Sequence, residues 1–373
     1  MAKKQRAAKQ STPAKKSAPT LKRDEVEAAR RAANASPAAQ AAAAKQERER
    51  RSAEAAKVRQ ERQAAAAKRA AARRRAHLGD WIGAARIPTL PLSVAPVILG
   101  AATVYLATLD LEGAWPHWLR FATCLAIAVC LQIGVNFAND YSDGVRGTDA
   151  GRHASAPGRL VASGKASPRA VLTVAMVWFG LAAIAGIILT VRTEHWWFLA
   201  VGAAALLAAW FYTGGKRPYG YLALGEVAVF VFFGGVAVIG TAFAIGGYVP
   251  FEAIVCAVAA GAFATATILI AHTRDISSDR AAGKRTLSVL LGDRASRILY
   301  VVLLVVPYLA AGLLMAMFYP RAIYAMLTLL IAIPAALIAL TAKSPRELVT
   351  VMRLTTLCSL AYAVLLGLAI AIW

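Results

Sequence analysis

The sequence predicts an all-α integral membrane protein with nine transmembrane helices and a basic amino-terminal extension. Hydrophobic residues make up 58% of the 373 residues, and the mean hydropathy of +0.54 is too high for a soluble globule. Apolar runs of about 20 residues recur from residue 88 onward, the length that crosses about 30 Å of hydrocarbon. Residues 1–86 hold 23 Lys/Arg against 8 Asp/Glu, so most of the net charge of +22 lies ahead of these runs.

The extension spans residues 1–80, and residues 81–373 form the membrane domain. Residues 1–37 are rich in Lys, Ala, Ser and Pro and lack hydrophobic periodicity, which favours disorder. Residues 38–76 contain helix formers and almost no large apolar residue, which predicts a solvated charged helix. We interpret it as a basic extension without a specific function, and the alternative is a contact with lipid. No nucleic acid is expected as a partner. The acid-free first 23 residues resemble an organelle transit peptide, but no apolar stretch precedes residue 88 to form a secretory signal.

Nine apolar segments follow the extension. They cover residues 88–109, 118–138, 169–191, 196–213, 223–246, 250–271, 297–318, 322–341 and 350–372. The loops on one side (140–169, 214–221, 272–297 and 342–353) carry 16 Lys/Arg, and the opposite loops carry two. The positive-inside rule then places the amino terminus and the basic loops in the cytoplasm, which predicts a multi-pass protein of the cell (inner) membrane.

The segment NFANDYSDGVRGTD, residues 136–149, ends the second span with a cluster of polar side chains. Asn139 and Asp143 stand four residues apart and share one helical face, with Asp140 beside them. Gly144 and Gly147 let the chain fold back, so we expect Asp149 to return toward the same place.

A second cluster, HTRDISSDRAAGKRT, residues 272–286, ends the sixth span. Asp275 and Asp279 repeat the four-residue spacing, and carboxylates one turn apart repel each other unless a cation lies between them. Oxygen donors without Cys favour Mg²⁺, which binds one or two carboxylates together with substrate phosphate oxygens. Because both clusters lie on the predicted cytoplasmic face, they are placed to hold a diphosphate between them through magnesium.

Basic side chains accompany the acids on this face. Such residues also anchor helix ends in membranes generally, but beside carboxylates they would neutralise the charge of a departing diphosphate. They are Arg146, Lys216, Arg217, Lys284 and Arg285. His272 is a candidate base, with a structural histidine as the commoner case. The four cysteines lie in apolar runs without metal-ligand spacing, so no disulfide or zinc site is predicted.

At these residues the chain resembles the UbiA superfamily of intramembrane aromatic prenyltransferases. That family's first motif is N-x-x-x-D-x-x-x-D, its second is D-x-x-x-D, and Tyr212 with Lys216 and Arg217 resembles its YxxxK turn. The first motif departs at its third acid, because position 147 is glycine and the acid appears at Asp149. This spacing, with RDISSDRAAGKRTLSVLLG and the entry sequence WIGAARIPTLPLSVAPV, is similar to the menaquinone branch, the 1,4-dihydroxy-2-naphthoate polyprenyltransferases.

The resemblance implies a UbiA-type fold and a magnesium-dependent transfer of a polyprenyl group. A polyprenyl diphosphate would be the donor and 1,4-dihydroxy-2-naphthoate the acceptor, with loss of the carboxyl group giving demethylmenaquinol. Asp143, Asp279 and Lys216 would be catalytic. Metal ligands would be Asn139, Asp140, Asp143, Asp149, Asp275 and Asp279. Diphosphate contacts would come from Asn139, Arg146, Tyr212, Lys216, Arg217, Lys284 and Arg285.

Other functions stay open at this point. The acceptor of the same fold is alternatively 4-hydroxybenzoate, haem or a chlorophyllide. Intramembrane carboxylates also mark ion pathways, but a transporter predicts acids near the bilayer midplane, whereas these lie at span ends. A lipid-binding scaffold is a third reading. The sequence sets neither the prenyl chain length nor the oligomeric state.

Overall fold

The computed structural model describes residues 76–108, 116–149 and 159–372, together with single residues and short stretches between 36 and 61. The chain divides into two units, Met1–Ala67 and Lys68–Trp373. The described residues of the first unit are helical from residue 37 onward. Most of the predicted disorder over 1–37 and charged helix over 38–76 lies outside the described residues.

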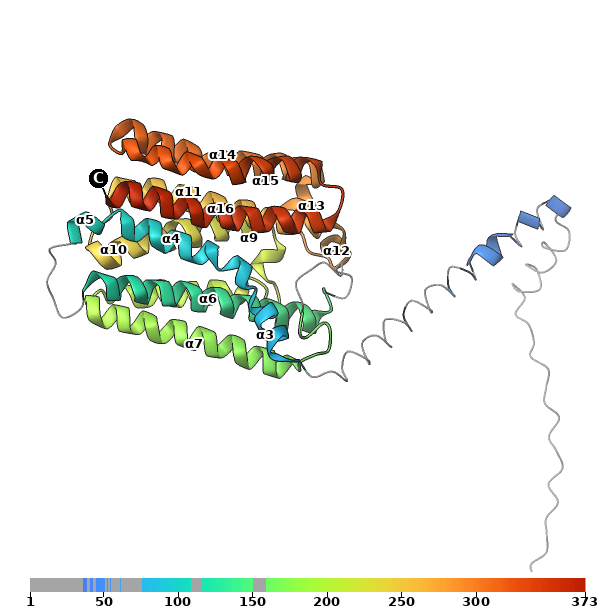
Figure 1. Ribbon diagram of the computed structural model, residues 1–373. Coiled ribbons are helices and arrows are strands. Elements are labelled where there is room, and N and C mark those ends of the chain that lie inside the picture. The colour runs from blue at the N-terminus through green and yellow to red at the C-terminus, as the bar shows by residue number, and fades with distance from the viewer. Residues whose placement is uncertain are drawn as a thin grey trace, which may run out of the picture. The chain divides into compact units, whose positions relative to one another are not determined.

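Every regular element of the described part of the second unit is helical, as predicted (Figure 1). The elements are α3 (Leu78–Ala85), η1 (Ile87–Thr89), α4 (Pro91–Ala102), α5 (Tyr105–Thr108), α6 (His117–Arg146), α7 (Pro168–Thr193), α8 (Phe198–Phe211), η2 (Tyr219–Tyr221), α9 (Gly225–Val229), η3 (Phe230–Ile239, a π-helical stretch), α10 (Gly240–Gly246), α11 (Phe251–Arg274), α12 (Ile276–Ala281), α13 (Leu287–Leu291), α14 (Asp293–Met317), η4 (Pro320–Thr328), α15 (Leu329–Thr341) and α16 (Pro345–Ala371).

Helix α11 forms the centre of the bundle. It packs against α14, η3, α16 and α4, and most of its residues are buried. Its buried face is rich in alanine. In lipid there is no hydrophobic driving force between helices, so association relies on close packing, and small side chains let neighbouring backbones approach each other. At one close contact, a Cβ added to Gly234 of η3 would lie 2.4 Å from the carbonyl oxygen of Ala257 in α11. A larger residue at position 234 would therefore separate the two helices.

Each predicted span coincides with a helix or a run of helices, but the helices differ in their ability to cross a membrane. Seven helices of the described residues are long and apolar enough to span. The segment at 88–109 corresponds to a pair bent by 44°, Leu78–Thr89 and Pro91–Ala102, which makes an eighth span if it counts as one. The segment predicted at 196–213 is α8, with only 14 helical residues. The described residues thus support a multi-pass membrane protein with seven or eight full-length spans. The fourth predicted span, α8, is shorter than a full crossing, so nine spans are not confirmed.

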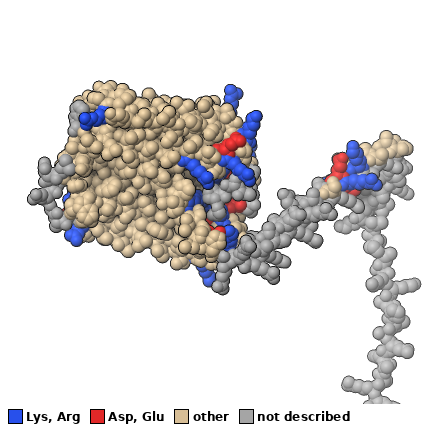
Figure 2. Space-filling model, in the orientation of Figure 1, with Lys and Arg blue, Asp and Glu red and all other residues tan. Residues whose placement is uncertain are grey.

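Charged and apolar side chains separate on the surface of the second unit (Figure 2). The sides of the bundle are almost free of charge and expose large apolar side chains such as Leu309 and Leu330, which are normal where lipid replaces water. Acidic and basic side chains gather at the end where Figure 1 shows α12 and α13. The carboxyl-terminal end of α6 lies at this same end, so both predicted motifs belong to it.

Candidate functional site

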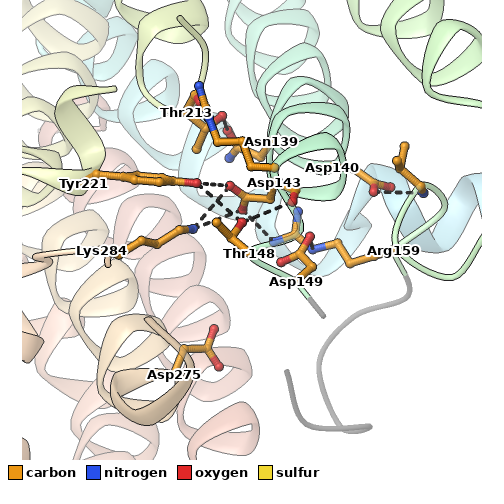
Figure 3. Close-up of polar contacts among 12 residues, drawn as sticks. Asn139, Asp140, Asp143, Thr148, Asp149, Arg159, Thr213, Tyr221, Asp275 and Lys284 are labelled. Carbon is orange, nitrogen blue, oxygen red and sulfur yellow. Dashed lines mark hydrogen bonds and ion pairs between the residues drawn. The ribbon is translucent and has the colours of Figure 1, made fainter. Parts of the chain in front are cut away.

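The first motif occupies the last turns of α6, which continues past the predicted end of the span. The polar side chains of these turns are buried: Asn139, Asp140 and Asp143. The helix ends at Gly147, whose φ of 76° lies in the left-handed region that glycine adopts without strain. The N–H of Thr148 then donates to the carbonyl of Asp143 at 3.1 Å. This turn brings Asp149 back beside the helix end (Figure 3). Gly147 makes the turn as predicted, whereas Gly144 remains within α6.

Three side chains from separate segments contact the Asp143 carboxylate (Figure 3). Tyr221 donates its hydroxyl to Oδ1 at 2.6 Å, and Lys284 Nζ lies 3.3 Å from both carboxylate oxygens. A guanidinium nitrogen of Arg159 lies 3.6 Å from Oδ2. Only 2% of Asp143 is exposed, and a buried charge needs such compensation to remain ionised. The Lys284 contact joins the segment of the second motif, residues 272–286, to the first motif.

Arg159 is a site residue that the sequence analysis missed. Its Nε lies 3.4 Å from Asp149 Oδ2, so one guanidinium serves two acids of the first motif. It stands ten residues beyond Asp149, in a loop that offers no periodic spacing to relate the two. The only signal available from the sequence was a basic residue in the loop that follows the motif.

Asp140 has different partners from its neighbours in the motif. Its carboxylate accepts the backbone N–H of Leu160 at 2.8 Å and that of Val161 at 3.3 Å. Val161 also packs so closely on α6 that a Cβ on Gly144 would lie 2.5 Å from its side chain. Asp140, which was predicted as a metal ligand, thus anchors the loop that carries Arg159 to α6.

The second motif lies where α11 breaks. Asp275 leaves the helical conformation (φ −102°), and the N–H of Asp279 donates to its carbonyl at 2.8 Å within the turn that starts α12. The Asp275 carboxylate forms a two-pronged ion pair with Arg274, at 2.8 and 2.7 Å. Asp279 is buried, and its carbonyl accepts the N–H of Lys284 at 2.8 Å after the left-handed turn at Gly283. This turn directs Lys284 back toward Asp143.

A third segment contributes to the site beside the two Asp motifs, namely the turn between α8 and η2. Thr213 donates its hydroxyl to Asn139 Oδ1 at 2.6 Å. The Arg146 guanidinium donates to the carbonyls of Thr213 and Gly215, so it holds this turn against α6. Three loops from distant parts of the sequence therefore converge at one end of the bundle.

Tyr221 and Lys284 lie against each other at the point of convergence. The Lys284 ammonium is buried and lies 4.3 Å from the centre of the Tyr221 ring, a favourable cation–π contact. Burial, followed by the charge of Asp143, raises the pKa of Tyr221. The phenol therefore remains protonated and acts as a hydrogen-bond donor to Asp143.

The remaining predicted site residues lie at the margin. Lys216 and Arg217 are exposed on the turn after α8, and Arg285 is exposed while its N–H donates to the Tyr221 carbonyl at 2.9 Å. The hydroxyl of Tyr212 is buried. The structure thus gathers Asn139, Asp143, Asp149 and Lys284 around one point and leaves the exposed cations beside it.

The site offers hard oxygen donors, which suit Mg²⁺ better than softer metals. Among the described residues, no three His, Cys, Asp or Glu side chains are grouped closely enough to hold a metal ion. Cationic side chains neutralise the acids instead: Lys284 and Arg159 at Asp143, and Arg274 at Asp275. The carboxylates are suitable ligands for Mg²⁺. A bound cation would take the place of the lysine and arginine side chains that now neutralise them.

Comparison with known proteins decides the family. The sequence profile of the UbiA prenyltransferase family matches residues 93–360. The chain belongs to the UbiA prenyltransferase family. A second profile, described as a protein of unknown function, matches residues 15–137.

Relatives of this UbiA chain have named activities. It is 42% identical over 299 residues to the 1,4-dihydroxy-2-naphthoate octaprenyltransferase of Mycobacterium tuberculosis, covering 79% of this chain and 98% of the relative. It is 31% identical over 300 residues to the Haemophilus influenzae protein of the same name, covering 78% and 96%. A UbiA homologue from Archaeoglobus fulgidus, solved with GPP and Mg²⁺, has the same fold, with a TM-score of 0.51, 16% identity and coverage of 79% and 100%.

Proposed function

We propose that this protein transfers a polyprenyl group from a polyprenyl diphosphate to 1,4-dihydroxy-2-naphthoate, releasing diphosphate and CO₂ and giving demethylmenaquinol. The names of the relatives support the acceptor and the transfer. The observation that carries the proposal is the ion pair between Lys284 and Asp143, because it joins the two Asp motifs at one point.

Asn139, Asp143, Asp149, Asp275 and Asp279 are the proposed magnesium ligands of this site. Bound there, Mg²⁺ would neutralise negative charge on the diphosphate and make it a better leaving group. The Archaeoglobus homologue, solved with GPP and Mg²⁺, supports the choice of magnesium as the metal. Asp140 lies in the same motif, but its two backbone hydrogen bonds favour a structural role.

The cations of the site have a second role in this proposal. Lys284 and Arg159 neutralise Asp143 and are positioned to contact the diphosphate once a metal takes over the carboxylate. Their charge would stabilise the negative charge that grows on the leaving oxygens. Lys216 and Arg217, exposed on the turn beside the site, would attract the diphosphate from the aqueous side.

The electron balance of the reaction needs no external oxidant. The ring carbon that carries the carboxylate forms a bond to C1 of the prenyl group, and the C1–O electron pair leaves with the diphosphate. The bond between the ring and the carboxylate then breaks, its electrons restore the aromatic ring, and CO₂ departs. Both ring hydroxyls are retained.

The apolar sides of the bundle place the protein in a membrane, and we propose that its charged end faces the cytoplasm. The excess of Lys and Arg in the loops of that end supports this orientation. A donor with a long isoprenoid tail would then place its tail in the bilayer and its diphosphate at the charged end.

Mass spectrometry of products tests the proposal. The purified protein in lipid vesicles is given Mg²⁺, a polyprenyl diphosphate and either 1,4-dihydroxy-2-naphthoate or 4-hydroxybenzoate. We expect demethylmenaquinol from the naphthoate, no prenylated benzoate, and loss of product with EDTA that excess Mg²⁺ reverses. Product from the benzoate alone would overturn the proposed acceptor.

A further inference from the structure

A second buried carboxylate lies beside the Asp motifs but belongs to neither. Glu226, in the first turn of α9, is only 2% exposed. Its Oε1 lies 2.7 Å from Nδ1 of His272, in the last turn of α11. Because an ionised carboxylate only accepts hydrogen bonds, the proton between them belongs to His272 Nδ1. Thr265 also donates its hydroxyl to the Glu226 carbonyl at 3.4 Å, so the backbone of this turn is tied to α11.

The other oxygen of this carboxylate lacks an equivalent partner. Glu226 Oε2 is buried and has no hydrogen bond of normal geometry within the described residues. The hydroxyl of Tyr212 is buried and lacks a partner in the same part of the chain. It lies against the start of α9, where a Cβ on Gly225 would stand 3.2 Å from it. Native proteins rarely bury an acceptor and a donor in this state, and such groups call for an explanation such as a functional role.

The pair adjoins the second Asp motif. His272 precedes Asp275 by three residues, and Leu287, three residues after Lys284, also interacts with the Glu226 carboxylate. A group that binds Glu226 therefore lies next to the second motif.

Tyr212 connects the pair with the acids. Its neighbour Thr213 donates a hydrogen bond to Asn139 Oδ1 at 2.6 Å. The segment that carries the Tyr212 hydroxyl therefore also contacts the first Asp motif.

We propose that Glu226 Oε2 accepts a hydrogen bond from a ring hydroxyl of the aromatic acceptor, and that His272 positions Glu226 for this contact. This assignment rests on the proposed function, because it deepens the acceptor site of the same reaction. The hydroxyl keeps its proton, and the negative acceptor beside it increases the electron density of the ring that attacks the prenyl carbon. The buried carboxylate rejects acceptors that lack this hydroxyl, because binding them would leave Oε2 without a hydrogen-bond donor.

The test compares acceptor analogues. 1-Hydroxy-2-naphthoate and 4-hydroxy-2-naphthoate each lack one hydroxyl, and each is measured as a competitive inhibitor of the wild type, Glu226→Gln and Glu226→Ala. We expect Glu226→Ala to raise the inhibition constant of the analogue that keeps the bound hydroxyl by about 10- to 100-fold. The inhibition constant of the analogue that lacks that hydroxyl should change by less than about threefold, because this analogue does not contact Glu226 in the wild type. The KM for the prenyl diphosphate should stay within about twofold of the wild type in every variant.

His272→Ala should give the same selective pattern with a smaller loss, and His272→Gln, which keeps a donor, should recover part of it. Glu252→Gln is the matched control. Glu252 lies at the opposite end of α11 and accepts a hydrogen bond from Tyr319 at 3.1 Å, so its loss should leave both inhibition constants unchanged.

An equal rise in the inhibition constants of both analogues, or a parallel rise in the KM of the prenyl diphosphate, would overturn the assignment. The pair of Glu226 and His272 would then only stabilise the fold. Absence of wild-type turnover with 1,4-dihydroxy-2-naphthoate is a different failure. It would overturn the proposed function and this assignment with it, whereas turnover with equal weakening overturns the assignment alone.

Discussion

The two Asp motifs share one spacing but differ in the origin of the charges that neutralise them. Asp143 in the first motif is contacted by Tyr221, Lys284 and Arg159, which come from three separate segments. Asp275 in the second motif is paired with its own neighbour, Arg274. The first motif therefore depends on the tertiary arrangement of the loops, whereas the second brings its counter-charge within its own sequence.

The largest effect is expected from removing one acid of either motif. Asp143→Ala and Asp279→Ala should each lower kcat by about 10³-fold or more, because the charge on the leaving diphosphate loses its stabilisation. Product formation is measured at equal amounts of inserted protein. Asp293→Ala is the control, since Asp293 forms an exposed pair with Arg297 one turn away. Wild-type rates in the double variant with Mg²⁺ present would contradict the site.

Lys284 tests the link between the motifs. Lys284→Met should lower kcat by about 100-fold, since it removes a buried cation that faces Asp143 and the proposed leaving group. Lys284→Arg should restore part of the rate. Arg280→Met, at an exposed position in α12, is the comparison. Equal rates for the Lys284 and Arg280 variants would show that the two motifs work without this bridge.

Arg159 tests the tertiary character of the first motif alone. Arg159→Gln should raise the KM for the prenyl diphosphate by about 10-fold, because one guanidinium serves both Asp143 and Asp149. Arg169→Gln, exposed at the start of α7, should change it by less than about twofold. An unchanged KM in the Arg159 variant would assign this arginine to loop structure only.

The smallest effect on catalysis is expected from substitution of Asp140, which distinguishes a metal ligand from a residue that stabilises the fold. Asp140→Asn should lower the free energy of unfolding by about 1–3 kcal/mol, because one backbone N–H loses its charged acceptor. The Mg²⁺ concentration for half-maximal activity should stay the same, whereas Asp149→Asn should raise it. A raised Mg²⁺ requirement in a fully stable Asp140 variant would make Asp140 a ligand after all.

Local patterns in the sequence predicted much of this site. The apolar segments predicted the helices, and the four-residue spacings with Gly147 predicted the return of Asp149, because both depend on backbone geometry over a few residues. Contacts such as Arg159 with Asp143, or Thr213 with Asn139, join residues that no period relates. The role of Asp140 was hidden for the same reason, since its partners are backbone groups 20 residues away. Glu226 stood as a single acid at the start of an apolar run, and only the fold pairs it with His272.

The shortness of α8 has a consequence for the surrounding lipid. Its 14 residues extend about 21 Å, about 9 Å less than the hydrocarbon layer of a typical bilayer. A bilayer matches a short helix by thinning around it or by letting its flanking turn sink inward. The turn after α8 carries Thr213, which contacts Asn139, and Gly215, which Arg146 holds. We expect hydrophobic mismatch to couple membrane thickness to the depth of the proposed diphosphate site, so turnover should vary with the acyl-chain length of the vesicles that hold the enzyme.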